Sequence, residues 1–242
     1  MKVNQRAMKS RFYSANEITS AIATLSDQEA HHLLHVMRGK IGDEVTLFDG
    51  SGWEFAATIS QLGRSEVTLD ITGKAEVDRE RSMPLTIAVA LPKGDRQRVL
   101  IEKCVELGVT KVIPLETERS VAVPKDKSLE KLRRAVIESS KQCGRNRLMQ
   151  ISSGMPLDTL LQQPPESDSQ LRLLADPGGT ESLHDFSAEE GTRDSILVAI
   201  GPEGGFSESE LAAATGSDWH TVNLGPRILR IETAAIAFAA RL

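Results

Sequence analysis

Two glycine-rich turns near the C-terminus are the part of the sequence best suited to hold a small molecule. The first has the sequence GPEGG at residues 201–205 and follows an apolar run at 195–200; the second, Gly225-Pro226, follows a short apolar run at 221–224. Glycine serves where the backbone must approach a ligand or take a positive φ, and a neighbouring proline stiffens the turn. Because both turns follow apolar strands, they can bring bare backbone onto one ligand.

Neither turn matches a phosphate-binding fingerprint. The loop GxxxxGK[ST] needs a lysine and a hydroxyl partner, and the first turn lacks both. The dinucleotide fingerprint GxGxxG belongs early in a strand–turn–helix unit, whereas Gly201, Gly204 and Gly205 are spaced differently and lie near the C-terminus. One such turn alone is as often a plain connection as a ligand loop, so the prediction depends on the pair.

The composition is that of a globular protein. The chain has 242 residues, of which 40% are hydrophobic and 26% charged, and this length permits one or two domains. It has no apolar run of about 18 residues that would predict a membrane span, and its basic first residues are not followed by the apolar stretch of a secretion signal. The two cysteines lack metal-ligand spacing, so we expect no metal, no disulfide and a location in the cytoplasm.

The net charge of −5 hides an uneven distribution of charge. Residues 92–147 hold fourteen Lys or Arg against eight Asp or Glu, residues 148–242 hold five against fourteen, and residues 1–11 hold four basic residues and no acidic one. A basic segment in an acidic chain is compatible with RNA binding, because the local field attracts phosphate. Within the basic segment, Arg145 and Arg147 lie in a turn-like stretch and are predicted to contact RNA.

The first part of the chain has the pattern of a small β structure. Residues 1–74 are expected to form a small barrel, because their short alternating runs are separated by glycine-containing turns. A short helix at 26–37 is expected to begin with a capping box of Ser26 and Glu29. The polar residues 75–84 predict a linker. The expected strands of the barrel are 44–49, 53–62 and 66–72.

From Leu85 onward, strands alternate with helices, which predicts an α/β domain with a mainly parallel sheet. Ligands of such sheets lie at the carboxyl ends of the strands, so we expect the loops after residues 91, 200 and 224 to meet. The turn at 176–179 also follows a strand, but a plain connection is favoured there. The expected strands are 85–91, 111–115, 171–175, 195–200 and 221–224. The expected helices are 97–107, 128–143, 207–214 and 232–242, with Ser128 and Ser207 as N-caps and Glu210 completing a capping box.

Several short motifs precede the two turns. They are Arg11-Phe12-Tyr13, HHLLHVMR at 31–38, LFDG at 47–50, IEKCVELGV at 101–109, ERS at 118–120 and QCGRNR at 142–147. In this order, and together with the closing pair of turns, they make the chain resemble the RsmE family of SPOUT-class RNA methyltransferases over nearly its whole length. Members of that family methylate N3 of a uridine in small-subunit (16S) ribosomal RNA.

The resemblance implies a fold and partners. It implies a SPOUT methyltransferase domain over 85–242 that contains a trefoil knot, which no periodicity reveals, and a PUA-like RNA-binding β-barrel over 1–74. It implies a homodimer whose interface lies near the alanine-rich last helix at 232–242. The expected partner is small-subunit ribosomal RNA, free or in the assembled subunit, and no membrane.

The resemblance also implies S-adenosylmethionine as the cofactor, bound in a bent form at the glycine turns. Backbone groups of the turns would bind its adenine, and apolar side chains would enclose the ring. The candidate cofactor-binding residues are Leu91, Pro92, Ile200, Gly201, Gly204, Gly205, Leu224, Gly225, Ile228 and Leu229. The candidate RNA-binding residues are Arg11, Arg38, Arg119, Arg145 and Arg147.

Methylation of uridine N3 needs particular groups. N3 carries a proton at neutral pH and lies on the Watson–Crick edge, so the base must be unpaired. Proton loss spreads negative charge onto O2 and O4, which a guanidinium can stabilise, and Arg230 directly follows the cofactor loop. Glu203 and Glu232 could accept the proton, although each also has a structural reading: Glu203 as a turn acceptor and Glu232 as a first-turn acid favoured by the helix dipole.

Two alternative functions remain open at this point. The same fold could methylate a ribose 2′-hydroxyl in another RNA, or the chain could be a non-enzymatic RNA-binding protein of ribosome assembly. His31, His32 and His35 have neither an acid partner nor metal spacing, so surface histidines are favoured there over catalytic ones.

Overall fold

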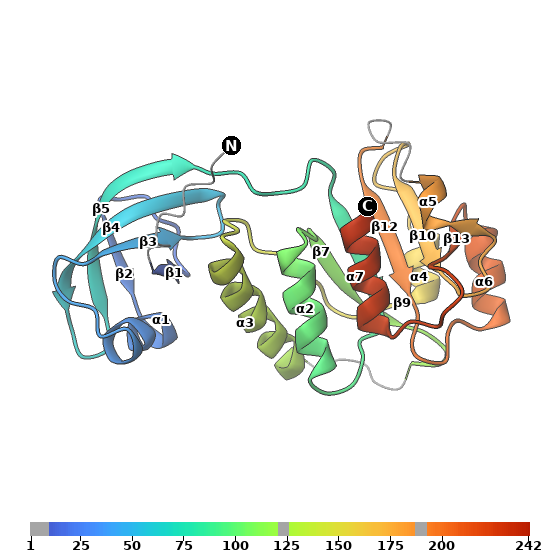
Figure 1. Ribbon diagram of the computed structural model, residues 1–242, viewed down its shortest axis with the longest axis horizontal. Coiled ribbons are helices and arrows are strands. Elements are labelled where there is room, and N and C mark those ends of the chain that lie inside the picture. Colours follow the sequence, from blue (N-terminus) through green and yellow to red (C-terminus); the bar gives the residue numbers. More distant parts are fainter. Residues whose placement is uncertain (1–9, 121–125, 187–192) are drawn as a thin grey trace. The chain divides into compact units, whose positions relative to one another are not determined.

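The computed structural model describes residues 10–120, 126–186 and 193–242, so most of the basic segment 1–11 lies outside the described residues. The chain divides into two compact units (Figure 1). Unit 1 comprises Met1–Glu80 and Ser140–Leu148, and unit 2 comprises Arg81–Ser139 and Met149–Leu242. The basic turn that holds Arg145 and Arg147 therefore packs with the N-terminal unit.

Unit 1 is built on a five-stranded sheet in the order β1-β3-β4-β5-β2 among the described residues. β1 pairs with β3 in parallel, and the other pairs are antiparallel. Alternate residues face one core, which includes Phe12, Leu47, Phe55 and Leu69, each 2% exposed or less. β5 runs into the start of the expected linker, because Glu76 still pairs with Trp53. The strands are β1 (Arg11–Tyr13), β2 (Ile22–Leu25), β3 (Glu44–Phe48), β4 (Trp53–Leu62) and β5 (Val67–Glu76).

The predicted helix of unit 1 is present as α1 (Asp27–His31) continued by a π-helical turn, η1 (His32–Val36). The predicted capping box at its start is wrong. The Ser26 hydroxyl donates to the Asp27 carboxylate, and Glu29 accepts from the Tyr13 N–H at 3.1 Å and from Lys141 Nζ at 2.8 Å. Asp27 takes a φ of 50°, outside the right-handed region, so the first turn lacks the geometry that a capping box needs.

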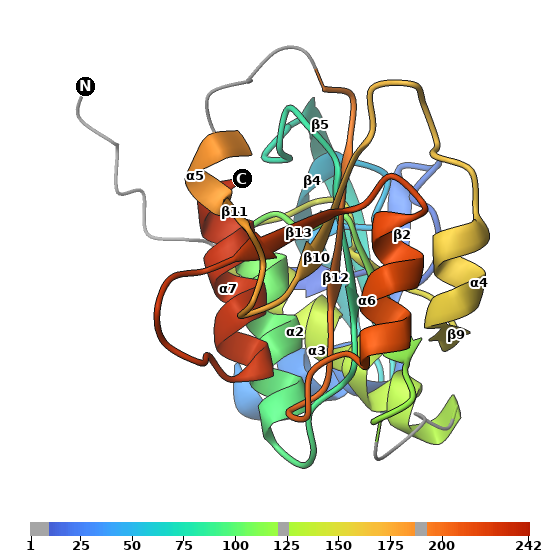
Figure 2. The ribbon, with the colours of Figure 1, turned by 90° about the vertical axis from the view of Figure 1, so that its right-hand side faces the viewer.

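Unit 2 contains a parallel sheet in the order β11-β13-β10-β12-β6-β7-β8 within the described residues, and β9 pairs in parallel with β7. α2 and α7 lie side by side on one face of the sheet, and α4 and α6 lie on the other (Figure 2). The expected mainly parallel α/β fold is confirmed. The strands are β6 (Leu85–Val89), β7 (Lys111–Glu116), β8 (Gln150–Ile151), β9 (Met155–Pro156), β10 (Leu171–Ala175), β11 (Glu181–Ser182), β12 (Ile196–Ile200) and β13 (His220–Asn223). The helices are α2 (Arg96–Glu106), α3 (Asp126–Cys143, whose last turn belongs to unit 1), α4 (Leu157–Gln162), α5 (Leu183–Phe186), α6 (Glu208–Thr215) and α7 (Ile231–Arg241).

Local sequence explains the main elements of unit 2. All five residues of β12 are buried, as expected for an apolar run between two parallel neighbours, β10 and β6. The predicted capping box of α6 is confirmed, because the Glu210 N–H donates to the Ser207 hydroxyl and the Ser207 N–H donates to Glu210 Oε2 at 2.7 Å. The predicted N-cap at Ser128 is wrong, since α3 already includes Asp126.

No helix among the described residues is long and apolar enough to cross a membrane. The trefoil knot stays a prediction.

Candidate functional site

A cavity of about 260 Å³ lies in unit 2 at the carboxyl ends of three parallel strands and against the start of α7. Both glycine turns line it, as the sequence predicted. The turn after β12 contributes Ile200, Gly201, Pro202, Glu203 and Gly205. The segment from β13 to α7 contributes Val222, Leu224, Gly225, Arg227, Ile228, Leu229, Arg230, Ile231 and Ala234.

A third turn, after β10, also lines the cavity through Ala175, Asp176 and Pro177. The sequence favours a plain connection at this place. The order of the strands places the turn after β10 at the cavity. β10 pairs with both β12 and β13, so it lies between the two strands that carry the glycine turns. The available signal was a buried strand followed by Pro-Gly-Gly, the same pattern that marks the other two turns.

Seven of the ten predicted cofactor-binding residues line the cavity, and Leu91, Pro92 and Gly204 do not. β6, which precedes Leu91, pairs with β12 on the side away from β10, so its loop leaves the sheet further from the cavity. Gly204 is exposed, and its carbonyl accepts a hydrogen bond from Arg119 Nη1 at 2.7 Å.

Two glycines of the first turn are needed for different reasons. Gly205 has a φ of 68°, and its N–H donates to the Pro202 carbonyl at 2.8 Å, so the backbone conformation itself favours glycine. Gly201 meets the Phe206 ring, to which a Cβ at this position would come within 3.1 Å. Phe206 is 5% exposed and belongs to the core, so a side chain at 201 would displace a packed ring.

The second turn is tied to its neighbour by Asn223. The Asn223 side-chain amide donates to the carbonyls of Gly179 and Glu181 at 2.8 and 3.1 Å, and its oxygen accepts from the Gly225 N–H at 3.2 Å. Gly225 has a φ of 101°, and no atom lies within 4 Å of the place its Cβ would take. Further along, Ile228 is 85% exposed, so the turn presents an apolar side chain as well as bare backbone.

The candidate catalytic residues lie in two settings. Arg230 is the N-cap residue of α7, is exposed and lines the cavity. Glu203 also lines the cavity, and its side chain is 50% exposed. Glu232 does not line it; its side chain is 10% exposed and lies in the first turn of α7.

Arg96 connects the two carboxylates, and sequence reasoning did not single it out. Its Nη2 lies 3.0 Å from Glu203 Oε1, and its Nη1 lies 3.8 Å from Glu232 Oε2. Arg96 is the first residue of α2, where the helix dipole disfavours a cation. A basic residue at the start of a helix that follows a buried strand was the available signal.

Arg11, a predicted RNA-binding residue, is engaged within unit 1. Its side chain is 8% exposed, donates to Glu54 Oε1 at 2.5 Å and to Asn146 Oδ1 at 2.7 Å, and lies over the Phe48 ring. Burial lowers the pKa of Arg11, and the hydrogen bond and charge of Glu54 oppose that shift. Arg11 therefore holds the turn at Asn146 against the N-terminal sheet.

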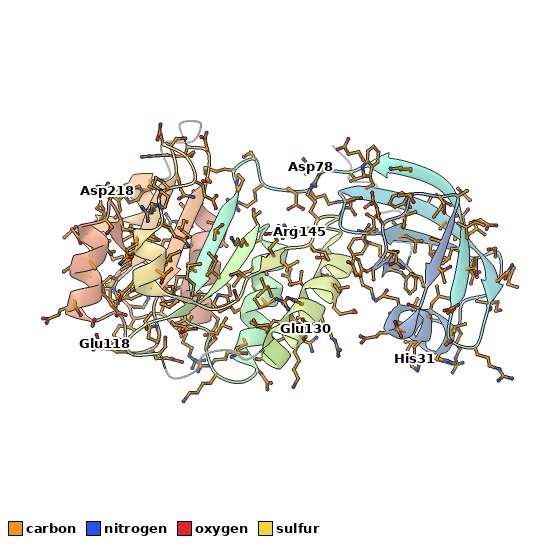
Figure 3. All side chains as sticks on the ribbon, turned by 180° about the vertical axis from the view of Figure 1, so that it is seen from behind. His31, Asp78, Glu118, Glu130, Arg145 and Asp218 are labelled. Carbon is orange, nitrogen blue, oxygen red and sulfur yellow. The ribbon has the colours of Figure 1, made fainter. Side chains whose placement is uncertain are left out.

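Arg145, labelled in Figure 3, is also engaged within unit 1. It is 4% exposed, and its guanidinium forms a two-point ion pair with Glu80, in which Nε lies 3.0 Å from Oε1 and Nη2 bonds Oε2. The other three predicted RNA-binding residues, Arg38, Arg119 and Arg147, are exposed. Arg147 lies against Gly52, where a Cβ would come within 2.9 Å of its Nη2.

The family comparisons agree with this architecture. Residues 79–242 match the model of an RNA methyltransferase domain, and residues 25–72 match that of an RNA methyltransferase PUA domain. A ribosomal RNA small subunit methyltransferase E from Rickettsia conorii is 32% identical over 100% of this chain and 96% of its own length. The protein of the same name from Bacillus subtilis is 30% identical over 88% of this chain and 86% of its own length.

Solved structures are similar over both units. A ribosomal RNA small subunit methyltransferase E from Neisseria gonorrhoeae, bound to S-adenosyl methionine, is 30% identical with a TM-score of 0.86, covering 96% of this chain and 95% of its own. A putative methyltransferase from Legionella pneumophila, in complex with the cofactor SAM, is 31% identical with a TM-score of 0.87, covering 96% of both chains. The chain therefore belongs to the RNA methyltransferase family, among the ribosomal RNA small subunit methyltransferase E (RsmE) proteins that its motifs resemble.

Proposed function

We propose that this protein transfers the methyl group of S-adenosylmethionine to N3 of a uridine in 16S ribosomal RNA. The observation that carries the proposal is the single cavity formed by both glycine turns in a chain whose solved relatives hold this cofactor. The names of the relatives support the small-subunit RNA as substrate, and the chemistry of the cavity supports the reaction.

The residues of the cavity fit the cofactor. No atom lies within 4 Å of the Cβ positions of Gly205 and Gly225, so the backbone at both turns is open to a ligand that approaches closely. Leu224, Ile228 and Leu229 supply apolar surface for the adenine ring. When bound, the cofactor supplies an electrophilic methyl group to the substrate.

The charged residues at the cavity have distinct roles in the proposed reaction. The uridine would be held unpaired, so that its N3 can reach the methyl group of the cofactor that the residues of the cavity would hold. Arg230 stabilises the negative charge that proton loss leaves on O2 and O4, because its guanidinium is exposed at the start of α7. Glu203 accepts the proton, since it lines the cavity and its side chain is half exposed. Glu232 does not line the cavity; its side chain is buried and lies near Arg96.

RNA binding is proposed to use arginines of both units. Arg38 and Arg147 on unit 1 and Arg119 on unit 2 are exposed. The match to an RNA methyltransferase PUA domain supports unit 1 as an RNA-binding unit. We further propose that the protein acts as a homodimer in the cytoplasm, on the free RNA or the assembled subunit.

The reaction is tested by mapping its product. The purified protein is titrated with S-adenosylmethionine by calorimetry, and is then incubated with unmethylated 16S RNA and, separately, with small subunits. Mass spectrometry of the digested RNA is expected to find 3-methyluridine at one site. A 2′-O-methylated nucleoside would contradict the N3 assignment, and absence of cofactor binding would favour a non-enzymatic assembly protein.

A further inference from the structure

We propose that Arg96 is a positioning residue that ties the first glycine turn to α7 and so fixes the wall of the cavity that carries Glu203. The proposal rests on the proposed function, because the cavity is taken to be the cofactor site. Its parts lie on three segments of unit 2: the start of α2, the turn after β12 and the first turn of α7.

The contacts join two segments that are distant in sequence. Arg96 Nη2 donates to Glu203 Oε1 at 3.0 Å, and Arg96 Nη1 lies 3.8 Å from Glu232 Oε2. The two carboxylates belong to different walls, since Glu203 lies in the glycine turn and Glu232 two residues after Arg230. One planar guanidinium with donors pointing in two directions can hold both, which a lysine ammonium does less well.

The position of Arg96 needs a compensating interaction. The N-terminus of a helix carries partial positive charge, so a cation in the first turn is disfavoured there. Asp95, the N-cap residue of α2, makes no side-chain capping bond that would offset this. Arg98, two residues on, is compensated within its own helix, because its Nε lies 2.6 Å from Glu102 Oε1. Arg96 is compensated instead by the two carboxylates across the turn.

The buried carboxylate of Glu232 is stabilised by the charge of the same Arg96 guanidinium. Its Oε2 is buried and has no hydrogen-bond partner among the described residues, and Arg96 is the cation that lies near it. A buried carboxylate without a compensating charge or hydrogen bond is costly, so Arg96 supports the start of α7 as well as the glycine turn. This start of α7 holds Arg230 at the cavity.

The glycine turn is held differently on its other side. Arg119 Nη1 donates to the carbonyls of Gly204 and Phe206 at 2.7 and 3.3 Å. These bonds anchor the backbone of the turn, whereas the Glu203 side chain is bonded by Arg96. Loss of Arg96 is therefore expected to loosen the turn and release Glu203 without unfolding the unit.

Hydrogen exchange of the cofactor-free protein tests this tie directly. We expect R96Q to raise amide exchange at residues 202–206 and in the first turn of α7 by about 2- to 5-fold, the range for a partly exposed ion pair. R96K is expected to lie between the wild type and R96Q. R98Q is the matched control, because it removes an ion pair from the same helix turn. Unchanged exchange in R96Q, or an equal rise in R98Q at the same residues, would overturn the proposal.

Cofactor binding separates positioning from general stability. In calorimetry, R96Q and E203Q are each expected to weaken S-adenosylmethionine binding by about 3- to 10-fold. The double variant is expected to bind the cofactor no more weakly than the weaker-binding single variant, because all three variants lack the same contact between Arg96 and Glu203. R98Q is expected to bind as the wild type. Additive losses would refute the link through Glu203. If the wild type itself binds no cofactor, the proposed function fails, whereas the exchange result still decides the role of Arg96.

Discussion

The guanidinium of Arg172 lies over the indole ring of Trp219, with its Cζ 4.8 Å from the ring centroid. Arg172 is 8% exposed, and burial lowers its pKa, an effect opposed by the charge of Asp218. Its donors reach carbonyls at the ends of two helices: Leu161 and Gln163 at the end of α4, at 3.2 and 3.1 Å, and Ser217 after α6, at 3.4 Å. Helix C-termini carry partial negative charge, so they stabilise this buried cation, to which no carboxylate of the described residues is hydrogen-bonded.

Replacement of this arginine is expected to destabilise unit 2. R172M removes three hydrogen bonds, of which the one to the Leu161 carbonyl is buried, so we expect a loss of about 2–4 kcal/mol in the free energy of unfolding. Urea denaturation measures it. R98M, which removes an exposed ion pair, is the control and is expected to leave the free energy of unfolding nearly unchanged. Equal losses in the two variants would show that the helix-end contacts of Arg172 contribute nothing.

Alanine at Gly205 is expected to strain the first glycine turn. Gly205 has open space at its Cβ position but a φ of 68°, so G205A should cost about 1 kcal/mol through backbone conformation alone. We expect weaker S-adenosylmethionine binding as well. G216A is the matched control, because Gly216 has a φ of −74° that alanine adopts without strain. A G205A protein as stable as G216A would contradict the argument.

Arg230 is expected to act on the chemical step more than on cofactor binding. R230Q should lower kcat by about 100-fold, the usual loss for one preorganised charge-stabilising donor, with the cofactor Kd changed less than about 3-fold. R227Q is the control, since Arg227 also lines the cavity and is exposed. Steady-state methylation of small-subunit RNA measures kcat, and calorimetry measures the cofactor Kd. A similar fall in kcat for R227Q would remove the special role of Arg230.

Two arginines in one turn are expected to have different roles, Arg147 in RNA binding and Arg145 in stability. R147Q should weaken RNA binding and reduce the salt slope of the binding constant by about 1, because Arg147 is exposed. R145Q should instead lower stability, because it leaves Glu80 without its buried partner. Filter binding at several salt concentrations and thermal melting distinguish them. A stable R145Q protein with weakened RNA binding would restore Arg145 as an RNA contact.

The stability of unit 1 is expected to depend on pH through Glu54. Burial raises the pKa of Glu54, but Arg79 and Arg11 outweigh that effect and hold the pKa below its ordinary value of 4.5. A lowered pKa in the folded state means that this stabilisation is complete above the unfolded pKa and is lost as the pH falls through the folded one. E54Q should thus be less stable than the wild type at pH 7, and the difference should shrink below about pH 4.5. A difference that stays constant from pH 7 to pH 3 would contradict this assignment.

Local pattern predicted much of the fold. The strand at 53–62 and the strand at 171–175 were predicted with the bounds that the structure has, and the capping box of Ser207 and Glu210 was predicted from spacing alone. Such features depend on neighbours a few residues apart. The two-residue strands β8, β9 and β11 were not predicted, because two residues contain no periodicity.

The sequence by itself determined that two glycine turns follow buried strands of a parallel sheet, and that they resemble those of one family. Only the tertiary structure decided that β10 lies between those strands, which makes Asp176 and Pro177 part of the cavity and leaves Leu91 outside it. Only the fold brought Arg96 to Glu203 and Glu232, and buried Arg11 and Arg145 in ion pairs. The physical reason is that periodicity reports which face of an element is apolar, whereas strand order and charge pairing arise from contacts between residues far apart in the chain.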